Sequence, residues 1–149
     1  MKIEPKYAID KLPGTFIKRV FIGGNYSFGS RIEDIADAVR DCEYVPIIVW
    51  EFGVTPGTER HSSKQILRQC KYAIFDVSSP AGHFFEMDDA EEYSLVCLCL
   101  WDSHLDQGEG PTISAMVRSH TMFAHNKPFR NTRMLQSEVH RFLENKELA

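Results

Sequence analysis

Short apolar segments alternate with segments of helical periodicity along the sequence, and no other feature restricts the fold as strongly. Five apolar segments predict strands: Lys18–Ile22, Tyr44–Trp50, Tyr72–Phe75, Leu95–Trp101, and either Thr121–Ala124 or part of Lys127–Asn131. Helices are expected from Ser30, from Ser62, close before Glu86, from Pro111, and over Met134–Asn145. Strands that alternate with helices form parallel sheets, because each helix returns the chain to the start of the next strand.

This order predicts a single α/β domain over residues 1–149, of flavodoxin-like (Rossmann-like) type. We expect a five-stranded parallel sheet with helices on both faces. Right-handed crossovers would place the first and third strands side by side, at the switch point where such folds bind ligands. Residues 1–17 show no clear periodicity, which allows an N-terminal extension there.

Two four-residue patterns fit a capping box, in which a serine side chain accepts from a backbone N–H at the start of a helix. They are Ser30-Arg31-Ile32-Glu33 and Ser62-Ser63-Lys64-Gln65. We therefore expect two of the helices to begin at these serines.

The composition is that of a soluble globular protein: 43% of the 149 residues are hydrophobic, 26% are charged, and the net charge is -4. The sequence has no basic run or stripe, so a dedicated nucleic-acid-binding function is not expected. The longest apolar run, Leu95–Trp101, is far shorter than the roughly 20 residues of a membrane-spanning helix. Residues 1–11 lack the apolar core of a signal peptide, and a cytoplasmic location is expected.

The cysteines and histidines do not form a metal-binding pattern. Cys42, Cys70, Cys97 and Cys99 contain no C-x-x-C pair, and no histidine lies at zinc-finger spacing from them. Cys97 and Cys99 share one face of an apolar segment, where cysteine is usually a small buried side chain. We expect no metal and no redox cofactor.

Polar residues follow the third predicted strand, and among them is a candidate catalytic carboxylate. Asp76 ends the strand, Ser78 lies in the turn, and Glu86 lies close to the start of the next helix. Because the carboxyl ends of parallel strands face the ligand site, all three should lie at its mouth. The helix dipole keeps Glu86 ionised, whereas its apolar sequence neighbours desolvate it. Such a carboxylate suits a nucleophile that attacks an anomeric carbon.

The acidic residues of this region also have structural interpretations. Glu86 could be present only because a first-turn glutamate favours the helix dipole. Asp76 could bind a sugar hydroxyl or orient Glu86, or it could cap the turn through backbone N–H groups. The later acidic residues are interpreted as the solvated face of the helix: Asp88, Asp89, Glu91 and Glu92.

The segment Gly23-Gly24-Asn25-Tyr26 follows the first predicted strand. It matches neither a dinucleotide-binding glycine motif nor a P-loop. It could be a tight turn whose N–H groups approach a sugar or phosphate, with Tyr26 stacked on a base. It could equally be a plain strand-to-helix turn.

Two stretches resemble the nucleoside 2-deoxyribosyltransferase superfamily. The first reads Ala73-Ile74-Phe75-Asp76-Val77-Ser78, followed by Gly82, Phe85-Glu86 and Ala90. The second reads Ile113-Ser114-Ala115-Met116-Val117-Arg118. It is similar to a Ser-Ala-Met-Ile-Arg segment of the 2'-deoxynucleoside 5'-monophosphate N-glycosidases of that superfamily. With Val20–Gly24, the resemblance extends from Lys18 to about Ser119.

The resemblance implies a set of site residues. Glu86 would be the nucleophile that attacks C1' of the sugar. Ser114 would reach the 5'-phosphate, in some family members across a dimer interface, so a homodimer is expected. The expected catalytic residues are Glu86 and Asp76, and the expected substrate-binding residues are Gly23, Gly24, Asn25, Tyr26, Ser78, Gly82, Ser114 and Met116. The family usually carries an acidic residue in the helix before the third strand, where this chain has Ser63 or Lys64.

The function implied by the resemblance is cleavage of the base–sugar bond of a nucleotide, either a nucleoside 5'-monophosphate or NAD. NAD is included because the same sheet, with a lone glutamate on the matching helix, occurs in TIR-type domains that cleave the nicotinamide–ribose bond. The expected partner is thus a small-molecule nucleotide. An alternative of a different class is a non-catalytic nucleotide-binding sensor or interaction module of the same fold.

Overall fold

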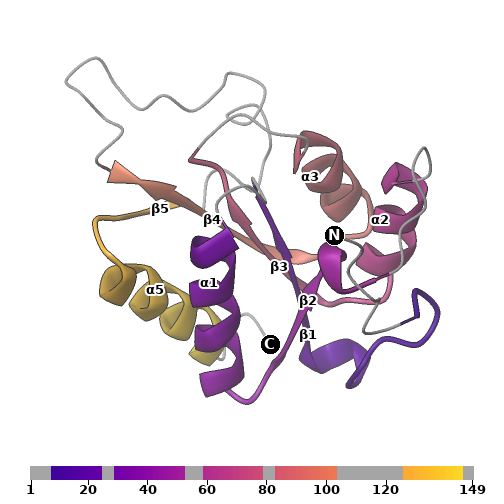
Figure 1. Cartoon of the computed structure of the whole chain (residues 1–149), viewed down its shortest axis with the longest axis horizontal. Helices are drawn as coiled ribbons and strands as arrows, with labels where there is room; N and C mark the ends of the chain where they lie inside the picture. Colours follow the sequence, from indigo (N-terminus) through magenta and orange to yellow (C-terminus); the bar gives the residue numbers. More distant parts are fainter. Residues whose placement is uncertain (1–7, 25–28, 53–58, 79–82, 104–125, 146–149) are drawn as a thin grey trace.

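The strands form one parallel sheet in the order β2-β1-β3-β4-β5, as the computed structural model of the chain shows (Figure 1). The structure describes residues 8–24, 29–52, 59–78, 83–103 and 126–145. The strands are β1 (Arg19–Gly23), β2 (Val45–Ile48), β3 (Tyr72–Asp76), β4 (Val96–Asp102) and β5 (Asn126–Phe129). The first and third strands are neighbours, which confirms the predicted switch point between them.

Helices cover both faces of the sheet (Figure 1). The described helices are α1 (Gly29–Asp41), α2 (Glu59–Leu67), α3 (His83–Glu92) and α5 (Thr132–Glu144), with short 3-10 turns at Phe16–Lys18 and Val49–Glu51. α1 and α5 pack together on one face, and α2 and α3 pack together on the other. The predicted flavodoxin-like α/β fold is therefore confirmed.

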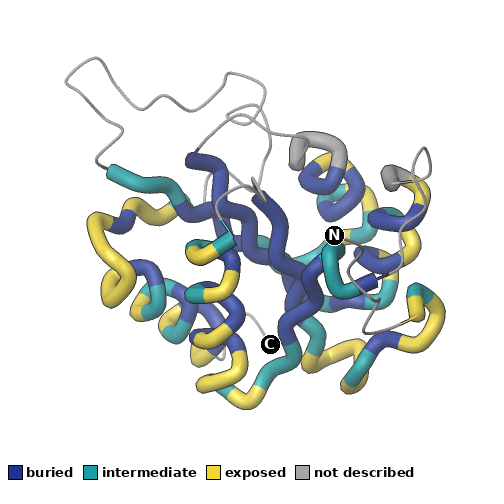
Figure 2. Tube along the Cα trace, in the orientation of Figure 1, coloured by how far each residue is buried: buried dark blue, intermediate teal, exposed yellow. Residues whose placement is uncertain are grey.

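Alternation along the strands sends side chains into two separate cores. Val20 and Ile22 of β1 belong to the core under α1 and α5, whereas Phe21 belongs to the core under α2 and α3. In β3, Ile74 and Phe75 divide between the two cores in the same way. The central strands β1 and β3 are accordingly buried on both sides, while the outer faces of the helices are exposed (Figure 2).

The two capping-box predictions are wrong. α2 begins at Glu59, so Ser62 and Ser63 lie inside the helix and are buried instead of capping it. α1 begins at Gly29, which places Ser30 within its first turn. A four-residue pattern cannot show whether the chain before it is already helical. A side-chain cap is present at α5, where the N-cap residue Asn131 accepts from the Met134 N–H at 2.8 Å.

The fifth strand is the second of the two predicted segments. β5 covers Asn126–Phe129 and pairs with β4 at the edge of the sheet, where Pro128 can be accommodated without a missing ladder bond. The segment Thr121–Ala124 and the helix expected from Pro111 lie outside the described residues. In α5, Leu135, Val139, Phe142 and Leu143 are buried as predicted.

The segment before β1 is tied to the domain by Arg19. Its guanidinium donates to the carbonyl oxygens of Leu12, Pro13 and Gly14 at 2.7–3.1 Å, and to the Gln69 carbonyl oxygen at 3.0 Å. Leu12 is buried in the core under α2 and α3. Residues 8–17 therefore pack against the domain through specific contacts, although their sequence shows no periodicity.

Among the residues that the structure describes, there is neither a metal-binding cluster nor a membrane-spanning helix. No group of three or more histidine, cysteine, aspartate or glutamate side chains in it is arranged to hold a metal ion. None of the helices in the described ranges is both long and apolar enough to cross a membrane.

Thiol reactivity provides a test of the core packing. Burial raises the pKa of Cys70, Cys97 and Cys99 to about 12. At pH 8 their thiolate fraction, and hence their alkylation rate, should be on the order of 10³-fold below that of an ordinary thiol. Burial also raises the pKa of Cys42, but less than that of the other three thiols, so mass spectrometry after a timed alkylation should find Cys42 modified first. Equal labelling of all four cysteines in the native protein would contradict this packing.

Candidate functional site

The carboxyl-terminal edge of the sheet brings together the described candidates for a site. β1 ends at Gly23, β3 at Asp76 and β4 at Asp102, and α1 and α3 begin at this same edge. In open parallel sheets ligands bind at this edge, beside the switch point. Of the predicted site residues, Asn25, Tyr26, Gly82, Ser114 and Met116 lie outside the described part of the chain.

The turn after β1 lies directly against the end of β3. A Cβ atom placed on Gly24 would come within 3.1 Å of both the Cβ and the carbonyl oxygen of Asp76. Gly24 also has a φ of 156°, which side-chain-bearing residues rarely adopt. A Cβ on Gly23 would lie 2.7 Å from the Phe75 ring. The predicted proximity of the glycine turn to the β3 end is thus present, and it requires glycine.

Gly24→Ala should therefore destabilise the protein by about 1–3 kcal/mol, because the new methyl group meets backbone and the φ is strained. The free energy of unfolding, measured by urea titration, checks this. Gly29→Ala is the matched control, since a Cβ there would be 3.8 Å from Trp50 at the start of α1. That control should be neutral or stabilising by up to about 1 kcal/mol. Equal losses in both variants would refute the close approach at Gly24.

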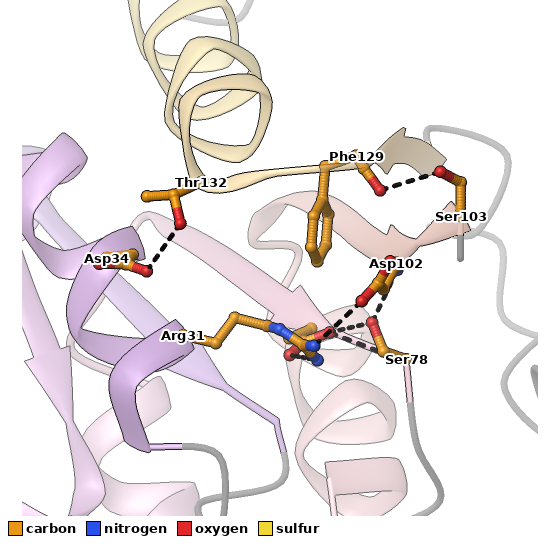
Figure 3. A network of polar contacts seen from close by, with 8 residues as sticks. Arg31, Asp34, Ser78, Asp102, Ser103, Phe129 and Thr132 are labelled. Atoms are coloured by element: carbon orange, nitrogen blue, oxygen red, sulfur yellow. Dashed lines mark hydrogen bonds and ion pairs between the residues drawn. The ribbon is translucent and has the colours of Figure 1, made fainter. Parts of the chain in front are cut away.

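A network of four polar residues, here called the switch-point network, occupies this edge on the α1 side: Arg31, Asp76, Ser78 and Asp102 (Figure 3). Arg31 Nη1 donates to Asp76 Oδ2 at 3.0 Å, and Arg31 Nη2 donates to Asp102 Oδ2 at 3.3 Å. The guanidinium carbon lies 5.4 Å from the centre of the Phe129 ring. One side chain of α1 therefore links the ends of β3, β4 and β5.

Ser78 completes the network from the connection that leads to α3. Asp76 Oδ1 accepts from the Ser78 N–H at 3.1 Å and from the Ser78 hydroxyl at 2.6 Å. The Ser78 hydroxyl in turn accepts from the Asp102 N–H at 2.8 Å. Asp76 and Ser78 are each only 3% exposed. Asp76 thus caps the turn through a backbone N–H, as its structural interpretation predicts. The same contacts fix the position of Ser78, where the connection to α3 begins.

The same contacts bear on the predicted roles of Asp76 and Ser78. The single hydroxyl proton of Ser78 is donated to Asp76, so donation to a substrate would require that bond to break. The Asp76 side chain meets Arg31 of α1, which covers the face of the sheet opposite to α3. Its catalytic role and the substrate-binding role of Ser78 stay predictions.

Glu86 is a buried carboxylate in the first turn of α3, with 7% of the residue exposed. Met87 and Ala90 beside it are completely buried in the core under α2 and α3. The helix dipole favours a negative charge at this position. The structure therefore places the predicted nucleophile at the carboxyl edge, in an environment with little water.

Where α2 packs against α3, Lys64 of α2 pairs with acidic side chains of α3, and Ser62, Ser63, Glu86 and Asp89 are buried polar residues of the same two helices. Lys64 Nζ lies 3.9 Å from Asp89 Oδ1 and 3.9 Å from Glu92 Oε2. Asp89 is 2% exposed, so its assignment to the solvated face was wrong. α3 contacts both β3 and α2, which widens its buried stripe to include Asp89.

Sequence reasoning missed Arg31, Lys64 and Asp89. Arg31 and Lys64 sit within the patterns that were assigned to helix capping. For Asp89 the available signal was its spacing, since it lies three residues after Glu86 and so shares a helix face with it.

No family model matches this chain, and no curated protein matches it either. Among solved structures, it is similar to a diflavin flavoprotein A3 from Nostoc sp., with a TM-score of 0.49 and 7% sequence identity. The similarity covers 87% of this chain and 90% of the flavoprotein chain.

Proposed function

We propose that the protein is an N-glycosidase that cleaves the base–sugar bond of a nucleotide, a nucleoside 5'-monophosphate or NAD, with Glu86 as the nucleophile. The observation that carries this proposal is the buried Glu86 carboxylate in the first turn of α3, at the carboxyl edge of the sheet. The spacing of Asp76, Ser78 and Glu86, which resembles the deoxyribosyltransferase superfamily, adds to it.

The reaction would proceed in two displacements. The Glu86 carboxylate attacks C1' of the sugar, a glycosyl ester bond forms, and the C1'–N bond breaks with its electron pair leaving on the base. Water then attacks C1', which releases the sugar, returns the carboxylate and frees one proton. The anionic base of a monophosphate takes up this proton, whereas nicotinamide leaves NAD as a neutral molecule and the proton goes to solvent. The negative charge of Glu86 stabilises the oxocarbenium-like transition states, and low hydration strengthens that effect.

In this reaction, the switch-point network would position the parts of the chain that surround the substrate. Ser78 is bonded to both Asp76 and Asp102, so the connection from β3 to α3 starts from a fixed point at the edge of the sheet. Gly24 allows the β1 turn to lie against Asp76, which leaves backbone next to the region that a sugar or phosphate would occupy. Arg31 compensates the buried charge of Asp76.

The test is a search for free base. The purified protein is incubated with NAD and with a panel of ribo- and deoxyribonucleoside 5'-monophosphates, and the products are separated by chromatography. Base release from at least one of these compounds is expected. Ser114→Ala should reduce release from monophosphates and leave release from NAD unchanged if the phosphate-binding role implied for Ser114 applies. Release from neither substrate class would contradict the enzymatic proposal.

A nucleotide sensor of the same fold is the second candidate, and one observation favours it. At the place where the resembled family usually has an acid, this chain has Ser63 and Lys64, and Lys64 is paired with Asp89. The charge at this position of α2 therefore differs from that of the resembled enzymes. Saturable binding of a nucleotide by calorimetry, with no base released over hours, would support the sensor.

A further inference from the structure

An aromatic side chain lies on the same face and at the same edge of the sheet as Glu86. Trp101 is the last residue but one of β4 (Val96–Asp102), and β4 pairs with β3, whose end leads to α3. Its indole packs against the core under α2 and α3, in which Met87 of α3 is also buried. Glu86 precedes Met87 in the first turn of α3. Trp101 and the proposed nucleophile therefore border the same part of the carboxyl edge.

A hydrogen bond fixes the orientation of the indole ring. Trp101 Nε1 donates to Asn126 Oδ1 at 2.9 Å, so the N–H edge of the ring is turned toward β5. This bond satisfies the polar group of the side chain and leaves the two apolar faces of the ring for packing. A ring that is already held in this way loses little further freedom when a flat ligand lies on it.

The protein covers this ring only in part. Trp101 is half-buried, whereas Cys99, two residues earlier on the same face of β4, is completely buried. The described part of the chain places no aromatic ring and no cation against the indole. Since β4 ends one residue later, the accessible part of the ring lies at the carboxyl edge, where parallel sheets bind ligands.

We propose that Trp101 stacks on the base of the bound nucleotide and so contributes to base recognition. A nucleophile approaches C1' from the side opposite to the leaving base, so the base lies beyond the sugar as seen from Glu86. Neighbouring strands are about 4.8 Å apart, so a long side chain at the end of β4 is within reach of that base. A role in base release rests on the proposed function, whereas stacking on a bound nucleotide does not.

The proposal specifies which ligands gain affinity from Trp101. Every base has a π-face, so purine, pyrimidine and nicotinamide nucleotides should all stack on the indole. Purine nucleotides should bind more tightly than pyrimidine nucleotides, because two rings cover more of the indole than one. Ribose 5-phosphate has the sugar and the phosphate but no base, so its affinity should not depend on Trp101.

Tryptophan fluorescence tests the stacking directly, because the chain has two tryptophans. Trp50 follows β2 and packs against the core under α1 and α5, on the opposite face of the sheet, so it serves as the control. Both single-tryptophan variants are made with Glu86→Gln, which prevents turnover. Purine and pyrimidine monophosphates and NAD are then added in turn. At least one of them should quench the emission of the Trp50→Phe variant, in which Trp101 remains. Absence of quenching by all of them in that variant would overturn the proposal.

Calorimetry measures the contribution of the ring to affinity. Trp101→Leu keeps the apolar bulk but removes the π-face, and it should weaken binding of the quenching nucleotide by about tenfold. Trp101→Phe keeps a ring and should stay within about threefold of the wild type. Ribose 5-phosphate should bind both variants as it binds the wild type. Equal losses for the nucleotide and for ribose 5-phosphate would assign Trp101 to the packing of the site and overturn the proposal. If Trp101→Leu does not fold, the fluorescence measurement decides, because it leaves Trp101 unchanged.

Base release is measured separately, so that the two proposals can fail independently. Trp101→Leu should raise the KM of base release and change kcat little, because stacking acts on the bound substrate and the transition state alike. Quenching of Trp101 without base release by the wild type would refute the proposed enzyme and leave the stacking intact. Base release that depends on Glu86, together with wild-type nucleotide affinity in Trp101→Leu, would refute the stacking alone.

Discussion

Replacing Glu86 with glutamine is expected to lower the rate of base release by about 10³-fold or more. The amide has almost the same shape as the carboxylate, but it carries no charge to stabilise the transition state and is a poor nucleophile. Substrate binding should change little, so the loss should appear in kcat. Steady-state rates from quantified free base measure this.

Glu92→Gln provides the matched control on the same helix. Its side chain is 62% exposed and lies two turns from the start of α3. The rate should stay within about twofold of the wild type, since the contact with Lys64 is long and solvent-exposed. A Glu86→Gln variant as active as Glu92→Gln would exclude Glu86 as the nucleophile.

Arg31→Met should cause the largest loss of stability among the changes considered, about 3 kcal/mol. Asp76 would remain 3% exposed while it loses the guanidinium that compensates its charge. The value is taken from the lower end for a broken buried ion pair, because Arg31 itself is 21% exposed. The melting temperature should fall by about 6–12 °C.

Arg40→Met controls for the loss of an arginine from the same helix. Arg40 pairs with Asp37 at 3.1 Å, but both side chains are exposed, so the loss should be below about 1 kcal/mol. Adding Asp76→Asn to Arg31→Met should recover part of the lost stability, because the uncompensated charge is then removed. Similar losses in Arg31→Met and Arg40→Met would mean that the switch-point network contributes nothing beyond a surface pair.

The order of the strands could be predicted because it depends on rules that are general to parallel sheets. Apolar runs such as Tyr72–Phe75 mark strands, and right-handed crossovers then place β1 beside β3. The position of Glu86 at the carboxyl edge follows from this order together with its closeness to the β3 end. These inferences need only local patterns and chain direction.

The surroundings of Glu86 could not be predicted, because they depend on how α2 meets α3. Ser62 and Ser63 were assigned to a helix cap, but the helix begins earlier and turns both toward the interior. Asp89 was assigned to solvent because a charged residue on a helix is usually exposed. Its burial results from contact with a second element that no local pattern of α3 records.

The switch-point network was hidden for a similar reason. Arg31 meets Asp76 and Asp102, which lie 45 and 71 residues away in the sequence. An arginine inside a helix-start pattern gives no sign of such partners. Alternation along β3 and β4 places both aspartates on the α1 side. This placement can be predicted only when the exact last residue of each strand is known.

The most direct test of the proposed mechanism asks whether a sugar becomes attached to Glu86. The wild-type protein is quenched with acid during turnover, digested, and analysed by mass spectrometry. We predict a peptide in which Glu86 carries the mass of the sugar of the cleaved nucleotide, with its phosphate where the substrate has one, and no such adduct in Glu86→Gln. Attachment at another residue, or undiminished base release by Glu86→Gln, would contradict the proposal.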